Sequence, residues 1–215
     1  MTKAFPLLLA LAGAFNAAQA QDVAAGARKV ETCIGCHGIV GYQASFPEIH
    51  KVPMISGQSA PYIVAALTGY KQGDRRHPTM RAAAGSMSEK DMADVAAYYE
   101  QHGRDPVKPV AAATAATPPP AVAALLAKGA CASCHGANYS QPVDAATPRI
   151  AGQHADYLYA ALKAYQTSGN RQVGRNNAIM VGMAKPYSHA ELQTIAQYLA
   201  SLPGELRTVP QSKFR

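Results

Sequence analysis

The chain has 215 residues, 20 of them basic and 13 acidic, which gives a formal net charge of +7 at neutral pH. The basic residues form no long run and do not alternate with aromatic ones, which argues against a nucleic-acid-binding protein. A chain of this length fits two small domains better than one.

Residues 1–20 have the three parts of a secretory signal peptide. Lys3 is followed by an apolar stretch from Phe5 to Phe15 and then by small residues that end at Ala20. The apolar stretch is shorter than the roughly 20 residues that a membrane-spanning helix needs, which disfavours an uncleaved anchor. We therefore expect cleavage after Ala20, export to the periplasm, and a mature chain with 19 basic and 13 acidic residues.

Two halves of the remaining chain carry the same residues in the same order, which indicates an internal duplication. The halves are residues 22–102 and 122–205, joined by a Pro- and Ala-rich stretch, 103–121, that predicts an extended linker. Residues 206–215 remain as a C-terminal tail. The repeated residues are Cys33, Cys36, His37, Pro53, Gly57, Gln58, Tyr62, Tyr70, Met80, Ser88 and Tyr98, matched by Cys131, Cys134, His135, Pro148, Gly152, Gln153, Tyr157, Tyr165, Met180, Ser188 and Tyr198.

Each half is predicted to contain three helices. Two are expected over residues 23–32 and 61–70 in the first half, and over residues 122–130 and 154–165 in the second. The third begins at a capping box, in which a hydroxyl and a carboxylate satisfy the first backbone N–H groups of the helix. The boxes are Ser88 with Asp91 and Ser188 with Glu191, followed at helical spacing by the apolar residues Met92, Val95, Ala96, Tyr99, Leu192, Ile195, Ala196 and Leu199. Alternating Val, Ile and Thr runs with hairpin turns are absent, so the predicted fold class is all-α.

All four cysteines lie in two Cys-x-x-Cys-His motifs. At this spacing two thiols can bond the two vinyl groups of one haem while the next imidazole reaches the iron. A zinc site built from all four cysteines would leave both histidines unexplained, and a dithiol redox site would explain neither the histidines nor the duplication. The sequence therefore predicts two covalently bound haem c groups, attached through Cys33, Cys36, Cys131 and Cys134, with His37 and His135 as iron ligands.

An iron that carries electrons without binding small molecules needs a second axial ligand. Met80 and Met180 are the candidates that repeat, and each stands eight residues before a helix-capping serine. We expect both in loops that close over the far side of the haem. Methionine ligation raises the reduction potential, which suits a carrier near the oxidising end of a respiratory chain.

Other candidates for this position are weaker. Met87 and Met183 lie in the same predicted loops but are not at equivalent positions, and His77 lies three residues before the first candidate methionine. Met54 and Met92 are interpreted as core residues, because methionine often fills irregular gaps in a core.

A proline follows each motif at the repeated position. Pro53 and Pro148 have no N–H group, and their carbonyls can accept a hydrogen bond from the proximal imidazole and so fix its orientation. The alternative is an ordinary turn proline.

With its duplicated Cys-x-x-Cys-His motifs, its Pro-x-x-x-Gly-Gln-x-x-x-Tyr segments and a methionine ahead of each Ser-capped helix, the chain resembles the di-haem cytochrome c4 family. The resemblance covers nearly all of residues 22–205 and implies two tandem class I cytochrome c domains related by pseudo-two-fold symmetry. It also implies a close helix crossing at Gly26, for which the second half has Ala124. The ligand pairs that it implies are His37 with Met80 and His135 with Met180.

The family is associated with electron delivery to terminal oxidases, so the resemblance implies a periplasmic electron carrier and not an enzyme. Its implied partners are redox proteins, such as a membrane-bound oxidase or a quinol-oxidising complex, with no nucleic acid and no small-molecule substrate. One alternative is the electron-accepting subunit of a periplasmic dehydrogenase. Another is a di-haem redox enzyme, which is disfavoured because no cysteine remains to act as a sulfur ligand.

Basic residues near the two methionines suggest how a partner would be attracted. We expect their charges to steer acidic partners towards the haem edges, the alternative being plain surface solvation. The residues are Arg75, Arg76, Arg81, Arg171, Arg175 and Lys185.

Overall fold

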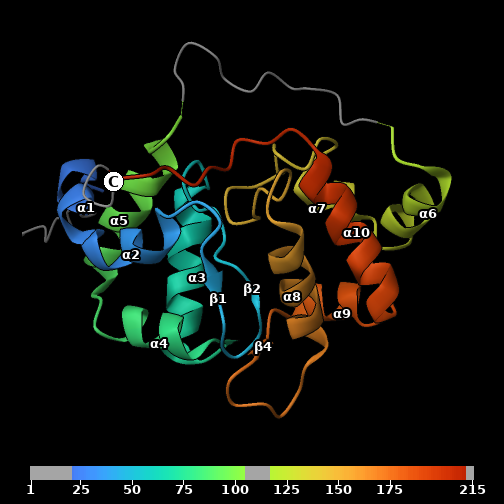
Figure 1. The fold of residues 1–215 in the computed structure, drawn as a ribbon, viewed down its shortest axis with the longest axis horizontal. Helices are drawn as coiled ribbons and strands as arrows, with labels where there is room; N and C mark the ends of the chain where they lie inside the picture. The colour runs from blue at the N-terminus through green and yellow to red at the C-terminus, as the bar shows by residue number, and fades with distance from the viewer. Residues whose placement is uncertain (1–20, 105–116, 212–215) are drawn as a thin grey trace, which may run out of the picture.

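The computed structural model describes residues 21–104 and 117–211, which form two helical domains side by side (Figure 1). The predicted signal peptide and most of the predicted linker lie outside these residues. No helix in the described ranges is long and apolar enough to cross a membrane.

The first domain contains five helices and three two-residue strands within its described residues. β1 and β2 form an antiparallel pair. In chain order the elements are α1 (Val23–Lys29), α2 (Glu31–His37), β1 (Gln43–Ala44), β2 (His50–Lys51), α3 (Ala60–Gln72), β3 (Arg75–Arg76), α4 (Pro78–Gly85) and α5 (Glu89–Gln101).

The second domain repeats this plan with five helices and one short strand in its described part. Its strand pairs antiparallel with β3 of the first domain, so the two domains share a small sheet. The elements are α6 (Pro120–Lys128), α7 (Cys131–His135), α8 (Ala155–Gln166), β4 (Gly174–Arg175), α9 (Ala178–Ala184) and α10 (His189–Ser201).

The predicted all-α class is confirmed, and the structure adds two helices per domain to the three expected from the sequence. The helix predicted over residues 23–32 divides at Val30, so that the first cysteine motif has a helix of its own, α2. Met80 and Met180, predicted in loops, lie in the short helices α4 and α9. These helices have eight and seven residues, too few for an apolar periodicity to show in the sequence.

Both predicted capping boxes are present at the starts of α5 and α10. Each serine hydroxyl accepts from the backbone N–H three residues on, and the carboxylate there accepts from the backbone N–H of the serine. All eight apolar residues predicted to follow the boxes are buried, and they lie in the two core clusters of the domains. The last helix of each domain therefore contributes a large part of the buried apolar surface of its core.

The first and last helices of the first domain cross at Gly26. A Cβ atom there would lie 2.1 Å from the backbone oxygen of Asp94 and 2.8 Å from the Cβ of Tyr98, so only glycine permits this approach. Ala124, its counterpart in sequence, is exposed on α6 and is not at a crossing. The second domain instead packs Val122 and Leu126 into its core.

We expect Gly26→Ala to lower the free energy of unfolding by about 1–3 kcal/mol, because the methyl group overlaps the backbone of α5. Denaturant unfolding followed by circular dichroism measures the loss. Gly85→Ala is the matched control, since a Cβ at this exposed helical position meets no atom within 4 Å. An equal loss in both variants would contradict the assignment of a close crossing.

Asp94 holds α1 against α5 through buried charge. Its carboxylate is fully buried and accepts from the backbone N–H of Asp22 (3.0 Å) and from the ammonium groups of Lys29 (2.8 Å) and Lys90 (2.9 Å). The hydrogen bond from Lys29, followed by those from Asp22 and Lys90, holds the pKa of Asp94 well below its usual range.

A carboxyl group whose pKa is lower in the folded state stabilises the fold above its unfolded pKa of about 3.9, and this contribution is lost as the pH falls further. We therefore expect the stability of the protein to drop steeply between about pH 4 and pH 2. Asp94→Asn should be less stable near neutral pH and should show a shallower drop in acid. Unfolding curves of both proteins across this range are the measurement, and parallel pH profiles would contradict the prediction.

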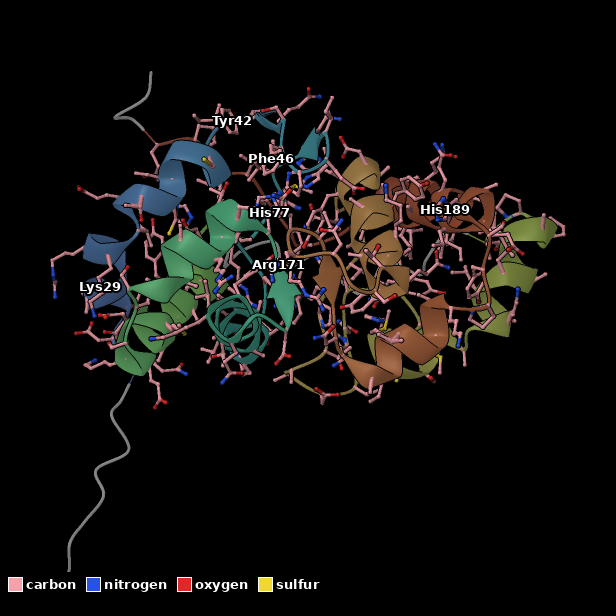
Figure 2. All side chains as sticks on the ribbon, turned by 90° about the horizontal axis from the view of Figure 1, so that it is seen from below. Lys29, Tyr42, Phe46, His77, Arg171 and His189 are labelled. Carbon is pink, nitrogen blue, oxygen red and sulfur yellow. The ribbon has the colours of Figure 1, made fainter. Side chains whose placement is uncertain are left out.

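The two domains differ in the segment between the Cys-x-x-Cys-His motif and the proline that accepts from its histidine. In the first domain this segment forms the β1–β2 hairpin, and Figure 2 shows Tyr42 and Phe46 projecting from it. Val40 and Ile49 there are more than two-thirds exposed. The corresponding described segment of the second domain, 136–147, has no strand and exposes one large apolar side chain, Val143.

The C-terminal tail docks on the first domain. After α10 the chain runs back across both domains, and its last described residues lie near α5 (Figure 1). The backbone N–H of Arg207 donates to the carbonyl of Ser56 at 3.0 Å, Leu206 is 2% exposed, and the side chain of Gln211 is hydrogen-bonded to His102 at 3.1 Å. The tail is therefore a second connection between the domains.

Candidate haem-binding sites

The first candidate site is built around the end of α2. Cys33 and Cys36 are free thiols, both partly buried, and His37 ends the helix. The Nδ1–H of His37 donates to the carbonyl of Pro53 at 2.8 Å. Since a carbonyl can only accept, the lone pair of the ring is on Nε2, the atom that would bind iron. Burial lowers the pKa of His37, which keeps the ring neutral.

The second candidate site repeats this arrangement on α7. Cys131 and Cys134 are also free thiols, and the Nδ1–H of His135 donates to the carbonyl of Pro148 at 3.0 Å. His135 is 8% exposed, and burial lowers its pKa. The two hydrogen bonds expected from the sequence are thus both present, whereas the role of the prolines in supporting an iron ligand stays a prediction.

The candidate methionines have equivalent places in the two domains. Met80 lies in the first turn of α4 and, like Cys33, is partly buried and packs against the core cluster of the first domain. Met180 lies in the first turn of α9 and is also partly buried. His77 and Asn177 cap these helices, and each accepts from the methionine backbone N–H, at 3.5 and 3.0 Å. His77 and Asn177 thus do the same thing, which is to cap the helix that carries the methionine.

The other methionines are less suitable. Met92 is 2% exposed in the first core, as expected from the sequence. Met183 is 43% exposed, and Met87 packs on the outside of the first core. Met54 lies at the contact between the domains, where its backbone is hydrogen-bonded to Gln153.

β3 carries Arg75 into the contact between the domains. Its guanidinium donates to the hydroxyls of Tyr62 (3.1 Å) and Tyr70 (3.4 Å) and lies over both rings. Its Nε atom is buried and has no hydrogen-bond partner among the described residues. A buried guanidinium with an unused donor is suited to bind a carboxylate.

β4 places Arg175 in the equivalent position. It donates to the hydroxyl of Tyr157 at 3.1 Å and lies over the rings of Tyr157 and Tyr165. Neither arginine of this pair forms an ion pair within the described ranges. Burial raises the pKa of Tyr157, but the positive charges of Arg175 and Arg75 outweigh this effect and bring the pKa down to about 8. The two arginines and the four tyrosines that they contact form an arginine–tyrosine cluster with excess positive charge.

These residues fit a haem c group at each motif. None of the four motif cysteines is in a disulfide, the imidazoles have the required tautomer, and the arginine–tyrosine cluster offers cationic donors for propionate carboxylates. A zinc site made from the cysteines does not fit, because no group of three or more His, Cys, Asp or Glu side chains among the described residues could hold a metal ion.

The cluster also corrects one expectation from the sequence. Arg75 and Arg175 were expected to face outward and attract partners, but both lie partly buried between the domains. The sequence could have indicated that these two arginines have equivalent places, because they are 100 residues apart, the same offset as Met80 and Met180. Their pairing in β3 and β4 places them face to face.

Comparisons with known proteins identify the same two domains. A family model described as "Cytochrome c" matches residues 23–102 and 121–203. The chain is 31% identical to cytochrome c4 of Azotobacter vinelandii over 94% of this chain and 100% of that protein, and 32% identical to the "thiosulfate dehydrogenase electron acceptor" of Stutzerimonas stutzeri over 79% and 78%. It is similar to the crystal structure of reduced recombinant cytochrome c4 from Pseudomonas stutzeri, with a TM-score of 0.63 and 26% identity over 86% of this chain and 100% of that one.

Two helical domains, each with a Cys-x-x-Cys-His motif whose imidazole is hydrogen-bonded to a proline carbonyl, define a two-domain c-type cytochrome. The chain belongs to the cytochrome c4 family. It carries two haem c groups at its two cysteine motifs, and it is an electron-transfer protein and not an enzyme.

Proposed function

We propose that this cytochrome is a periplasmic carrier that delivers electrons to a terminal oxidase or another respiratory partner. In the proposal the axial iron ligands are His37 with Met80 in the first domain and His135 with Met180 in the second. The observation that carries it is the equivalence of the two sites, in which both imidazoles have the same hydrogen bond and both methionines the same place in a capped helix. Two six-coordinate irons transfer electrons without binding small molecules.

The ligand assignment predicts that carbon monoxide does not change the spectrum of the reduced holoprotein, whose mass shows two covalent haems. Met80→Ala and Met180→Ala should each open one iron to the gas. Met87→Leu and Met183→Leu are the matched controls and should behave like the unchanged protein, because neither side chain is assigned to an iron. Binding of the gas by the unchanged protein would contradict one of the two assignments.

A second candidate is the electron acceptor of a periplasmic dehydrogenase, and the relative from Stutzerimonas stutzeri with that description favours it. The two candidates differ in the partner whose reaction with this cytochrome has to be demonstrated. A carrier to an oxidase, once reduced, is oxidised by membranes from the source organism with uptake of oxygen. An acceptor, once oxidised, is reduced by a periplasmic extract to which thiosulfate is added.

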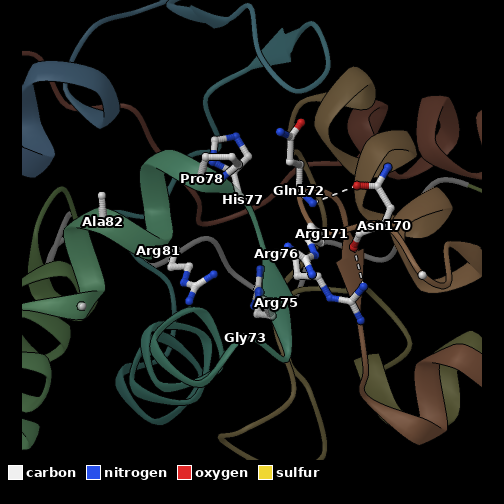
Figure 3. Close-up of a pocket in the computed structure, with 12 residues that line it drawn as sticks. Gly73, Arg75, Arg76, His77, Pro78, Arg81, Ala82, Asn170, Arg171 and Gln172 are labelled. Atoms are coloured by element: carbon white, nitrogen blue, oxygen red, sulfur yellow. Dashed lines mark hydrogen bonds between the residues drawn. The ribbon is translucent and has the colours of Figure 1, made fainter.

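A groove between the domains supports an acidic partner. It has a volume of about 780 Å³ and runs between α4 and residues 169–172 (Figure 3). Arg76, Arg81 and Arg171 line it, and no acidic residue does so within the described ranges. Arg76 is fixed there by Asn170, whose carbonyl accepts at 2.5 Å. Guanidinium groups bind carboxylates, so the groove fits a carboxylate-bearing surface beside the helix that carries Met80.

Reversal of charge in the groove should slow reaction with an anionic oxidant. For the reduced double variant Arg81→Glu with Arg171→Glu, we expect oxidation by ferricyanide to be about tenfold slower in stopped flow at low salt, and oxidation by cobalt(III) tris-phenanthroline to be no slower. The control, Arg28→Glu with Lys71→Glu, makes the same charge change at exposed residues outside the groove. The same loss in the control would mean that net charge, and not the groove, sets the rate.

A further inference from the structure

Two glutamines link the domains in a reciprocal way. Gln153 of the second domain accepts from the backbone N–H of Met54 at 3.0 Å and donates to its carbonyl at 2.8 Å. Gln58 of the first domain accepts from the backbone N–H of Arg149 at 3.0 Å and donates to its carbonyl at 2.9 Å. Each amide thus satisfies both backbone groups of one residue in the other domain.

The residue held in this way directly follows the proline of each haem site. Met54 follows Pro53, whose carbonyl accepts from His37, and Arg149 follows Pro148, whose carbonyl accepts from His135. A peptide plane is rigid, so the backbone N–H of Met54 and the carbonyl of Pro53 belong to one planar unit. The hydrogen bond to the glutamine therefore fixes the direction of the carbonyl that orients the histidine.

The glutamines themselves have little freedom. Gln58 and Gln153 are each 4% exposed, and each amide oxygen also accepts from the next backbone N–H in its own chain segment. The preceding glycines have positive φ values, and their N–H groups donate to the last helices, Gly57 to Tyr99 and Gly152 to Leu199. Each glutamine is therefore anchored on the core of its own domain while it holds the proline segment of the other.

We propose that Gln58 and Gln153 are positioning residues that act across the domain contact, so that each domain sets the strength of the proximal histidine hydrogen bond in the other. This inference rests on the proposed axial role of the two histidines. A stronger hydrogen bond from Nδ1–H makes the imidazole a better donor to iron, which favours the ferric state and lowers the reduction potential. Loss of the glutamine should loosen the carbonyl and raise the potential of the haem in the opposite domain.

The test measures both reduction potentials by spectroelectrochemistry on the full holoprotein. Gln153→Leu should raise the potential of the first-domain haem and leave that of the second-domain haem in place, and Gln58→Leu should do the reverse. Met80→Ala and Met180→Ala, which each alter one haem, assign the two potentials to their domains. Asn176→Ala is the matched control, because it removes an uncharged interdomain acceptor for Arg76 that is not next to a proline.

A shift confined to the haem of the mutated domain, an equal shift of both haems, or no shift would overturn the inference. If Gln153→Leu or Gln58→Leu does not give a folded protein with two haems, Gln→Asn at the same position retains the amide but shortens its reach, and the same crossed shift is expected. Carbon monoxide added to each variant keeps the two proposals separate, since gas binding reports a failure of the ligand assignment and the potentials report the role of the glutamines.

Discussion

The hydrogen bonds from His37 to the carbonyl of Pro53 and from His135 to the carbonyl of Pro148 connect the cysteine helix of each domain to the segment that contacts the other domain. Each hydrogen bond selects the ring tautomer that leaves Nε2 free, and it requires the proline segment to stay at one distance from the cysteine helix. That segment has no regular structure of its own. It is held instead by the glycine–glutamine turn on the last helix and by the glutamine of the other domain. The segment that accepts from each histidine is therefore in contact with both domains.

The arginine–tyrosine cluster is also shared by the two domains, and there the connection depends on charge. Arg75 and Arg175 face each other in the β3–β4 pair without a carboxylate partner among the described residues, and two like charges so placed repel each other. Tyrosine hydroxyls and rings reduce this cost but do not neutralise it. A haem propionate bound at this contact would neutralise the charge, and haem attachment would then favour the docking of the domains.

Much of the fold and of the sites could be predicted because it depends on local patterns that occur twice. The cysteine motifs, the capping boxes and the buried faces of α5 and α10 each have a physical signature within a few residues. The contacts between domains have no such signature. Arg75 was expected at the surface because a sequence does not show which charge a second domain covers, and α4 and α9 were missed because seven or eight residues are too few for periodicity. Ala124, which departs from the glycine of the first half, is exposed, so a matching position in the repeat does not guarantee matching packing.

The duplication gave two similar sites but not two interchangeable domains. The first domain has the close helix crossing at Gly26, the buried carboxylate of Asp94 and the exposed hairpin, and it also receives the tail of the second domain. The tail joins the domains in addition to the covalent connection through residues 103–121. Two tethers at different places keep the local concentration of one domain near the other high, even when the contact between them opens. The restraint that holds the glutamines beside the opposite prolines is therefore built into the chain itself.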